Sequence, residues 1–175
     1  EYKLSVGFNG DLDLLEKMYA DKENKIGTLY TGGYLKEVTS GRYQHSKSEQ
    51  ELERIVEAVH DKNARLAVTL NSPLSEKQWW ENVKNYLKHL ESIGVDTAII
   101  AHPFIMALAK ENTNLSVAAS IICDVNTPRG ALYYEDMGAD VIVPSSSINY
   151  DLEQLKQIKA NLKKAKLALL VNEAC

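Results

Sequence analysis

The chain has 175 residues, enough for one domain with a substantial core, and its 45% hydrophobic and 25% charged residues are ordinary for a globular protein. Its formal net charge of −4 gives no global electrostatic reason to bind nucleic acid or an anionic membrane. No apolar run approaches the roughly 20 residues that cross a bilayer, and two cysteines, Cys123 and Cys175, argue against a disulfide framework.

Apolar runs of β type alternate with amphipathic helical stretches along the chain. The expected strands are residues 3–9, 25–31, 65–71, 97–102, 115–122, 140–145 and 166–172. Several, such as AIIA and VIVP, are nearly continuous apolar runs, which is typical of parallel strands covered on both faces.

The stretches between these strands carry apolar residues at the three- and four-residue spacing of a helix face. Two such stripes are Leu52, Ile55, Val56 and Val59, and Leu152, Leu155, Ile158 and Leu162. Helix starts are expected at Ser48, Ser75 and Asp151. Helix ends are expected at Gly94 and Gly138.

Seven strands with six helices between them, joined by right-handed crossovers, form either an open doubly wound sheet or a barrel. A complete eight-stranded barrel needs about 250 residues. We therefore expect an α/β fold over residues 1–175: a single-domain parallel (β/α) TIM-type barrel of about seven βα units, truncated at its C-terminal end. A further segment, a second chain or a homo-oligomer is expected to cover its open edges. The N-terminus lacks the pattern of a signal peptide, so we expect a cytoplasmic protein without membrane contact.

In such a barrel the functional residues gather at the carboxyl ends of the strands. His102 follows AIIA at one such end, where it is a candidate general base or metal ligand. The pair Gly32 and Gly33 is either an anion-binding turn or simply a tight turn. Arg42 and Arg129 are either anion ligands or solvated side chains.

Three stretches of the chain carry a family resemblance through their order and spacing. The first is LYTGGYL followed by an arginine loop, the helix SEQELERIVEAVHDKN and the strand ARLAVTLNS. The second is VAASIICDVNTPRGALYYEDMGADVIVPSSSINYDLEQLKQIK, and the third is LALLVNEAC. Together they resemble peptidase family U32, and the matching positions are Tyr30, Gly32, Gly33, Arg42, His60, Asn71, Ser120, Asn126 and Cys175.

This resemblance implies a barrel enzyme with an iron–sulfur centre. Several members are similar to oxygen-independent hydroxylation proteins that act on RNA bases or a quinone precursor and carry a four-iron four-sulfur (4Fe-4S) cluster. Cys175 would match the first cluster cysteine, with the other ligands beyond residue 175. Asn172 and Glu173 replace the usual histidine and glycine before that cysteine, and Cys123 stands where a small non-ligand residue is expected, so its role stays open.

The leading hypothesis is a hydroxylation-type enzyme or subunit of this family. Its expected catalytic residues are His102, Asn71 and Glu173, and the cluster ligand is Cys175. Its expected substrate-binding residues are Tyr30, Gly32, Gly33, Arg42, Ser120 and Asn126. A small molecule, a nucleic acid and a peptide all remain possible substrates. The alternatives are a collagenase-like peptidase, as older family assignments have it, or a non-catalytic barrel that binds a small anion.

Overall fold

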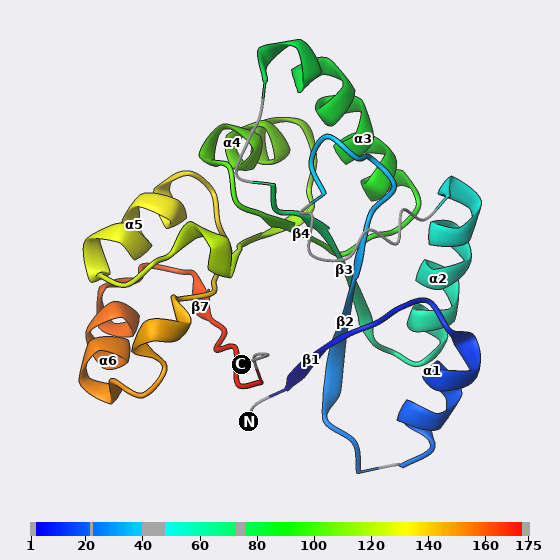
Figure 1. The fold of residues 1–175 in the computed structure, drawn as a ribbon, viewed down its shortest axis with the longest axis horizontal. Helices are drawn as coiled ribbons and strands as arrows, with labels where there is room; N and C mark the ends of the chain where they lie inside the picture. Colours follow the sequence, from blue (N-terminus) through cyan, green and yellow to red (C-terminus); the bar gives the residue numbers. More distant parts are fainter. Residues whose placement is uncertain (1–2, 22, 40–47, 73–75, 173–175) are drawn as a thin grey trace.

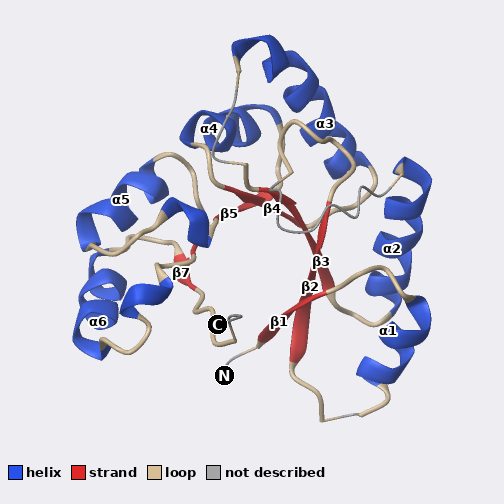
Figure 2. Cartoon of the chain, viewed as in Figure 1, coloured by secondary structure: helices blue, strands red, loops and turns tan. Residues whose placement is uncertain are grey.

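The computed structural model describes residues 3–21, 23–39, 48–72 and 76–172. Within these residues, seven parallel strands form one sheet in which each strand pairs with the next in chain order. The strands are β1 (Leu4–Gly7), β2 (Ile26–Gly32), β3 (Arg65–Leu70), β4 (Thr97–Ile100), β5 (Ser116–Ala119), β6 (Val141–Ile142) and β7 (Lys166–Leu167). The sheet curves around a common centre with the helices outside it (Figures 1 and 2). This is an incomplete TIM-type α/β barrel, as the sequence predicts.

Each pair of successive strands is joined through a helix on the outer side of the sheet (Figure 1). The helices are α1 (Leu12–Tyr19), α2 (Glu49–Asp61), α3 (Trp80–Ser92), α4 (Pro103–Asn112), α5 (Pro128–Asp136) and α6 (Leu152–Asn161). Short 3₁₀ turns stand at Lys77–Trp79, Ile121–Cys123 and Ser146–Ile148. Within the described residues, no helix is long and apolar enough to cross a membrane.

Side chains at the helix termini satisfy backbone groups at the positions that the sequence indicates. The Ser48 hydroxyl accepts a hydrogen bond from the Glu51 N–H, and the Asp151 carboxylate accepts one from the Gln154 N–H. The chain leaves α3 and α5 with positive φ, at Gly94 (90°) and Gly138 (104°). The expected start at Ser75 lies outside the described residues.

The two faces of the sheet differ in side-chain size. Leu66, Val68 and Leu70 of β3 are fully buried and belong to the hydrophobic core between the sheet and the helices. The alternate residues point towards the barrel centre, and several of them are small, such as Ala67 and Ala118. The bulky core therefore lies outside the barrel, and the inward-facing side chains are of mixed size, because Tyr30 and Ile99 share this face with the alanines.

Two aspartates bind neighbouring strands together at the amino ends of the sheet. The Asp96 carboxylate, just before β4, accepts a 2.8 Å hydrogen bond from the first buried N–H of β3 and lies 2.9 Å from His60 Nε2. Asp140, just before β6, accepts a 2.8 Å bond from the Val117 N–H of β5 and pairs with Lys110. This repeated arrangement places His60 in the stabilising end of the barrel, the end opposite the expected site.

Three sequence predictions need correction. The expected strand over 115–122 ends at Ala119, because the Ser120 hydroxyl accepts a hydrogen bond from the Ile122 N–H and turns the chain into a 3₁₀ turn. The expected strand over 166–172 pairs only at Lys166–Leu167, where β6 offers just two residues as a partner. Leu152 is 65% exposed rather than buried, because it opens the first turn of α6, beyond the packed part of the helix.

Candidate functional site

Two polar side chains meet at the carboxyl end of the sheet. The final paired residues of β3, β4 and β5 are in register, so the residues that follow them, Asn71, Ala101 and Ser120, lie at one height. Asn71 Nδ2 lies 3.5 Å from the Ser120 hydroxyl oxygen. Because Ala101 between them has only a methyl group, side chains from two non-adjacent strands can approach each other across it.

Asn71 has an acceptor atom that nothing in the described part of the chain satisfies. Its Oδ1 is buried and has no hydrogen-bond partner there. A buried polar atom without a partner costs about 1–3 kcal/mol. Such an atom at the carboxyl end of a barrel is poised to accept a hydrogen bond from a ligand.

Ser120 is almost completely buried beside Asn71. Its hydroxyl oxygen already accepts a hydrogen bond from the Ile122 N–H at 3.3 Å, in addition to the Asn71 contact. No described histidine or carboxylate forms a hydrogen bond with this hydroxyl. Ser120 is therefore arranged to position Asn71, and within the described ranges no adjacent base activates it as a nucleophile.

His102 directly follows β4 and is the N-cap residue of α4. Its Nδ1 accepts a 3.2 Å hydrogen bond from the Phe104 N–H. Because Nδ1 accepts this bond, it is Nε2 that faces away from the helix cap and is open to other partners. Phe104 stacks on Trp80 with ring centroids 3.9 Å apart, so Trp80 acts as a packing residue beside the His102 turn.

The glycine pair after Tyr30 has a packing role in the structure. Gly32 is the last residue of β2, and neither glycine has a positive φ. A Cβ atom at Gly33 would lie 1.9 Å from the Tyr86 hydroxyl oxygen of α3. Gly33 therefore lets Tyr86 approach the backbone. Tyr30 lies lower in the barrel, with its ring against Gly7 of β1.

The other predicted site residues do not gather with Asn71 and Ser120. Asn126 and Arg129 are exposed near the start of α5, and the Asn126 carbonyl accepts a hydrogen bond from the Gln154 side chain. Arg42, Glu173 and Cys175 lie outside the described residues.

Cys123 is a half-buried thiol that lies against two backbone carbonyl oxygens. Its Sγ lies 3.5 Å from the Ala101 carbonyl oxygen and 3.7 Å from that of Ile100. Burial raises the pKa of the thiol to about 11, although the Tyr134 hydroxyl lowers it in part. The raised pKa disfavours the free thiolate, which is the form of a cysteine that makes nucleophilic attack.

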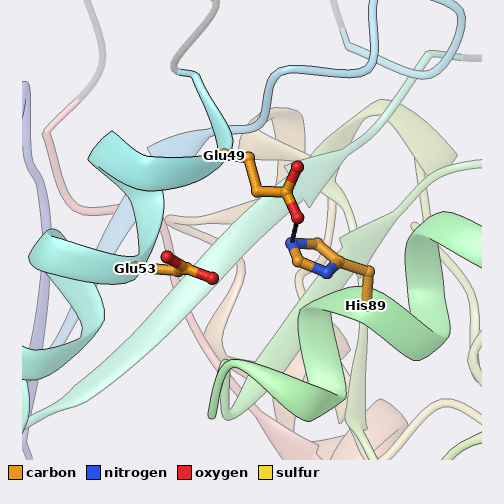
Figure 3. Close-up of side chains that lie close together, drawn as sticks. All are labelled: Glu49, Glu53 and His89. Atoms are coloured by element: carbon orange, nitrogen blue, oxygen red, sulfur yellow. Dashed lines mark ion pairs between the residues drawn. The ribbon is translucent and has the colours of Figure 1, made fainter.

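A second group of chemically active side chains, absent from the sequence analysis, lies between two helices. Glu49 and Glu53 of α2 face His89 of α3 (Figure 3). The four-residue spacing of the glutamates within SEQELERIV is visible in the sequence. The approach of His89 is not, because it depends on how neighbouring βα units pack.

These features define the class of protein: a parallel (β/α) barrel with a polar pair at the carboxyl ends of its strands. The family model of Peptidase family U32 matches residues 14–175, and the chain belongs to this family.

Two relatives come from Methanocaldococcus jannaschii. The chain is 37% identical over 86 residues to the uncharacterized protease MJ1657, which covers 49% of this chain and 25% of that protein. It is 30% identical over 141 residues to the uncharacterized protease MJ0090, with 81% and 33% covered. The chain thus spans a third or less of the length of these relatives.

Solved structures support the fold. The structure of the U32 peptidase Mk0906 superposes with a TM-score of 0.77 at 18% identity, over 97% of this chain and 68% of that one. A phosphonopyruvate hydrolase in complex with oxalate and Mg²⁺ gives a TM-score of 0.67 at 16% identity, over 97% and 67%. At such identities the likeness concerns the fold alone.

Proposed function

We propose that this chain is the barrel portion of a U32-family enzyme that binds its substrate at the carboxyl ends of the strands and carries out oxygen-independent hydroxylation. The observation that carries the binding site is the buried, unsatisfied Asn71 Oδ1. It favours a substrate group with an N–H or O–H donor, such as the imide of an RNA base or the hydroxyl of an aromatic precursor. His102, after the next strand, offers its Nε2 as a further hydrogen-bonding atom, because its Nδ1 is engaged by the Phe104 N–H.

Hydroxylation is preferred to peptide hydrolysis because of the surroundings of Ser120. Hydrolysis by a serine needs a base in contact with the hydroxyl. Here the Ser120 oxygen is engaged by the Ile122 N–H and the Asn71 amide. This arrangement supports ligand positioning more than nucleophilic attack.

The described cysteine does not fit the proposed iron–sulfur cluster. A cluster needs several thiolates. Cys123 is the one cysteine among the described residues, and its half-buried thiol lies against the carbonyl oxygens of Ile100 and Ala101. The cluster proposal therefore rests on the resemblance around Cys175, with further ligands outside this sequence. We assign to the described residues only substrate binding and positioning.

A second candidate function is a peptidase, and the names of the two M. jannaschii proteases favour it. A third is binding of a small anion without catalysis, through Arg129 and Arg42. In each case we propose a cytoplasmic protein in which a further segment or second chain covers the open edges beside β1 and β7.

Replacement of Asn71 by leucine is expected to weaken substrate binding without lowering the stability of the fold. The variant removes an unsatisfied buried acceptor, so its free energy of unfolding should stay equal or rise by up to about 1 kcal/mol. Binding of a donor-bearing substrate should weaken by about tenfold or more. Urea unfolding gives the first quantity, and calorimetry with uridine, a hydroxybenzoate and a short peptide as probes gives the second.

A second variant for this prediction is His102→Asn, which keeps an N-cap acceptor for α4 while it removes the imidazole. If a probe binds at the carboxyl ends of the strands, this variant should also bind it more weakly at unchanged stability. A loss of more than about 1 kcal/mol of stability in Asn71→Leu would mean that Asn71 is a structural residue.

Iron and acid-labile sulfide should be present in anaerobically prepared full-length protein and lost in its Cys175→Ser variant. The visible spectrum should change in parallel, because thiolate ligation of iron gives the cluster its absorption. Cys123→Ser, the matched control, should keep its iron. A full-length protein without iron would remove the hydroxylation proposal, and assays with peptide substrates would then test the peptidase.

A further inference from the structure

The outer wall of the barrel holds a group of three possible metal ligands away from the strand ends. Glu49 and Glu53 lie one turn apart on α2, on the face directed at α3, and His89 of α3 points towards them (Figure 3). One ligand atom from each side chain lies within 4.8 Å of the other two. Among the described residues, no other group of histidine, cysteine and carboxylate side chains has this geometry.

The contacts within this group leave its ligand atoms incompletely satisfied. His89 Nε2 lies 3.3 Å from Glu49 Oε1, close enough for an ion pair, yet it makes no hydrogen bond. Glu53 forms no ion pair in the described part of the chain, and no described lysine or arginine pairs with Glu49 either. Two carboxylates thus share one imidazole, an excess of negative charge that a cation would neutralise.

A pocket of about 300 Å³ opens beside His89, between the residues after β2 and α3. Its lining consists of Tyr34, Leu35, Asn82, Asn85, Tyr86 and His89. Tyr86 is only 5% exposed, and its hydroxyl is buried without a hydrogen-bond partner. The pocket wall thus carries two polar atoms without hydrogen-bond partners, the imidazole nitrogen beside the glutamates and the Tyr86 hydroxyl, which lies towards Gly33.

The two carboxylates also act electrostatically on Tyr34, which lines this pocket. Its ring packs edge-on against His89, with centroids 6.0 Å apart. Burial raises the pKa of the Tyr34 phenol, and the charges of Glu49 and Glu53 raise it further. Both carboxylates therefore act on the same small volume next to His89.

We propose that Glu49, Glu53 and His89 form a binding site for a divalent cation of the zinc class, which ties the start of α2 to α3. One imidazole and two carboxylates suit Zn²⁺ better than Mg²⁺ or Ca²⁺, which prefer oxygen ligands alone. Tetrahedral ligands about 2.1 Å from Zn²⁺ stand about 3.4 Å apart. His89 Nε2 and Glu49 Oε1 already lie 3.3 Å apart, so only Glu53 needs to move, by about an ångström. Three protein ligands leave a fourth position for water on the pocket side.

This site is independent of the substrate site proposed at the barrel mouth. The mouth involves Asn71 and Ser120 at the ends of β3 and β5, whereas the cation site involves only the outer helices. Failure of one proposal therefore leaves the other standing.

The test is titration of chelator-treated full-length protein with ZnSO₄, followed by calorimetry and thermal unfolding. The wild type should bind a zinc ion through this site and unfold at a higher temperature when zinc is present. His89→Gln and Glu53→Gln should each weaken this binding by about tenfold or more. Glu57→Gln, which removes the same charge one turn further along α2, should bind zinc as the wild type does.

Cobalt substitution distinguishes this site from one that uses cysteine. Co²⁺ bound by imidazole and carboxylates should give weak visible bands that disappear in His89→Gln. Strong near-ultraviolet absorption from thiolate, persisting in His89→Gln, would place the metal at a cysteine and overturn the proposal. So would zinc stabilisation that survives in both His89→Gln and Glu53→Gln, or equal responses to Zn²⁺ and Mg²⁺. Before metal is added, thermal unfolding of each variant shows that the variant folds.

Discussion

Gly33→Ala is expected to destabilise the protein by about 1–3 kcal/mol, towards the upper end of that range. A Cβ atom at this position would lie 1.9 Å from the Tyr86 hydroxyl oxygen and 3.1 Å from a methyl carbon of Val68. Tyr86 is buried between α3 and the sheet and packs edge-on against Tyr34, with centroids 4.8 Å apart, so its ring has little room to retreat. Urea unfolding of both proteins measures the difference.

Tyr86→Phe should rescue most of this loss, because it removes the atom that the new methyl group meets. By itself Tyr86→Phe should change stability little. The buried hydroxyl makes no hydrogen bond, although the backbone N–H groups of Tyr34 and Leu35 lie near it. The two single variants and the double variant form a cycle with a coupling energy of about 1 kcal/mol or more. If the double variant loses as much free energy of unfolding as the two single variants together, then the new methyl group does not clash with the hydroxyl.

Gly33 illustrates where local sequence reasoning fails. A glycine pair after a strand suggests a turn or an anion site, because both explanations use only its neighbours in the chain. Its observed partner, Tyr86, lies on a helix that follows the next strand. Such a reason for a glycine depends on tertiary packing, and nothing in the stretch LYTGGYL reveals it.

The strands and helices were largely predictable because burial on two faces leaves a strong pattern. Runs such as AIIA identify strands, and Ser48 and Asp151 cap helices where they are expected. Strand ends were predictable less well. An apolar run continues past Ala119, but the pairing stops there because the Ser120 side chain bonds the backbone two residues on. A side chain that competes for backbone hydrogen bonds changes structure without changing hydrophobicity.

The sequence allowed the positions of the site residues along the strands to be predicted, but not the contacts between their side chains. Asn71 and Ser120 were expected at strand ends, and the structure brings them together across Ala101. The small residue that permits this contact has no signature of its own in the sequence. The opposite end of the barrel is different in character: Asp96 and Asp140 there satisfy backbone groups of neighbouring strands, whereas Asn71 keeps an acceptor unsatisfied. The stabilising contacts and the proposed binding site thus lie at opposite ends of the same strands.

Leu155→Ala is expected to lower the free energy of unfolding by about 2–5 kcal/mol, the usual range for truncation of a buried leucine. Leu155 is 6% exposed on the inner face of α6, and the truncation leaves a cavity there that the surrounding helices and sheet fill only partly. Leu152, three residues earlier in the same predicted stripe, is 65% exposed and is the matched control. Leu152→Ala should cost less than about 0.5 kcal/mol in urea unfolding. A large loss at Leu152 would mean that another segment or chain covers this end of α6 in the full-length protein, whereas a small loss at Leu155 would mean that α6 contributes little to the barrel.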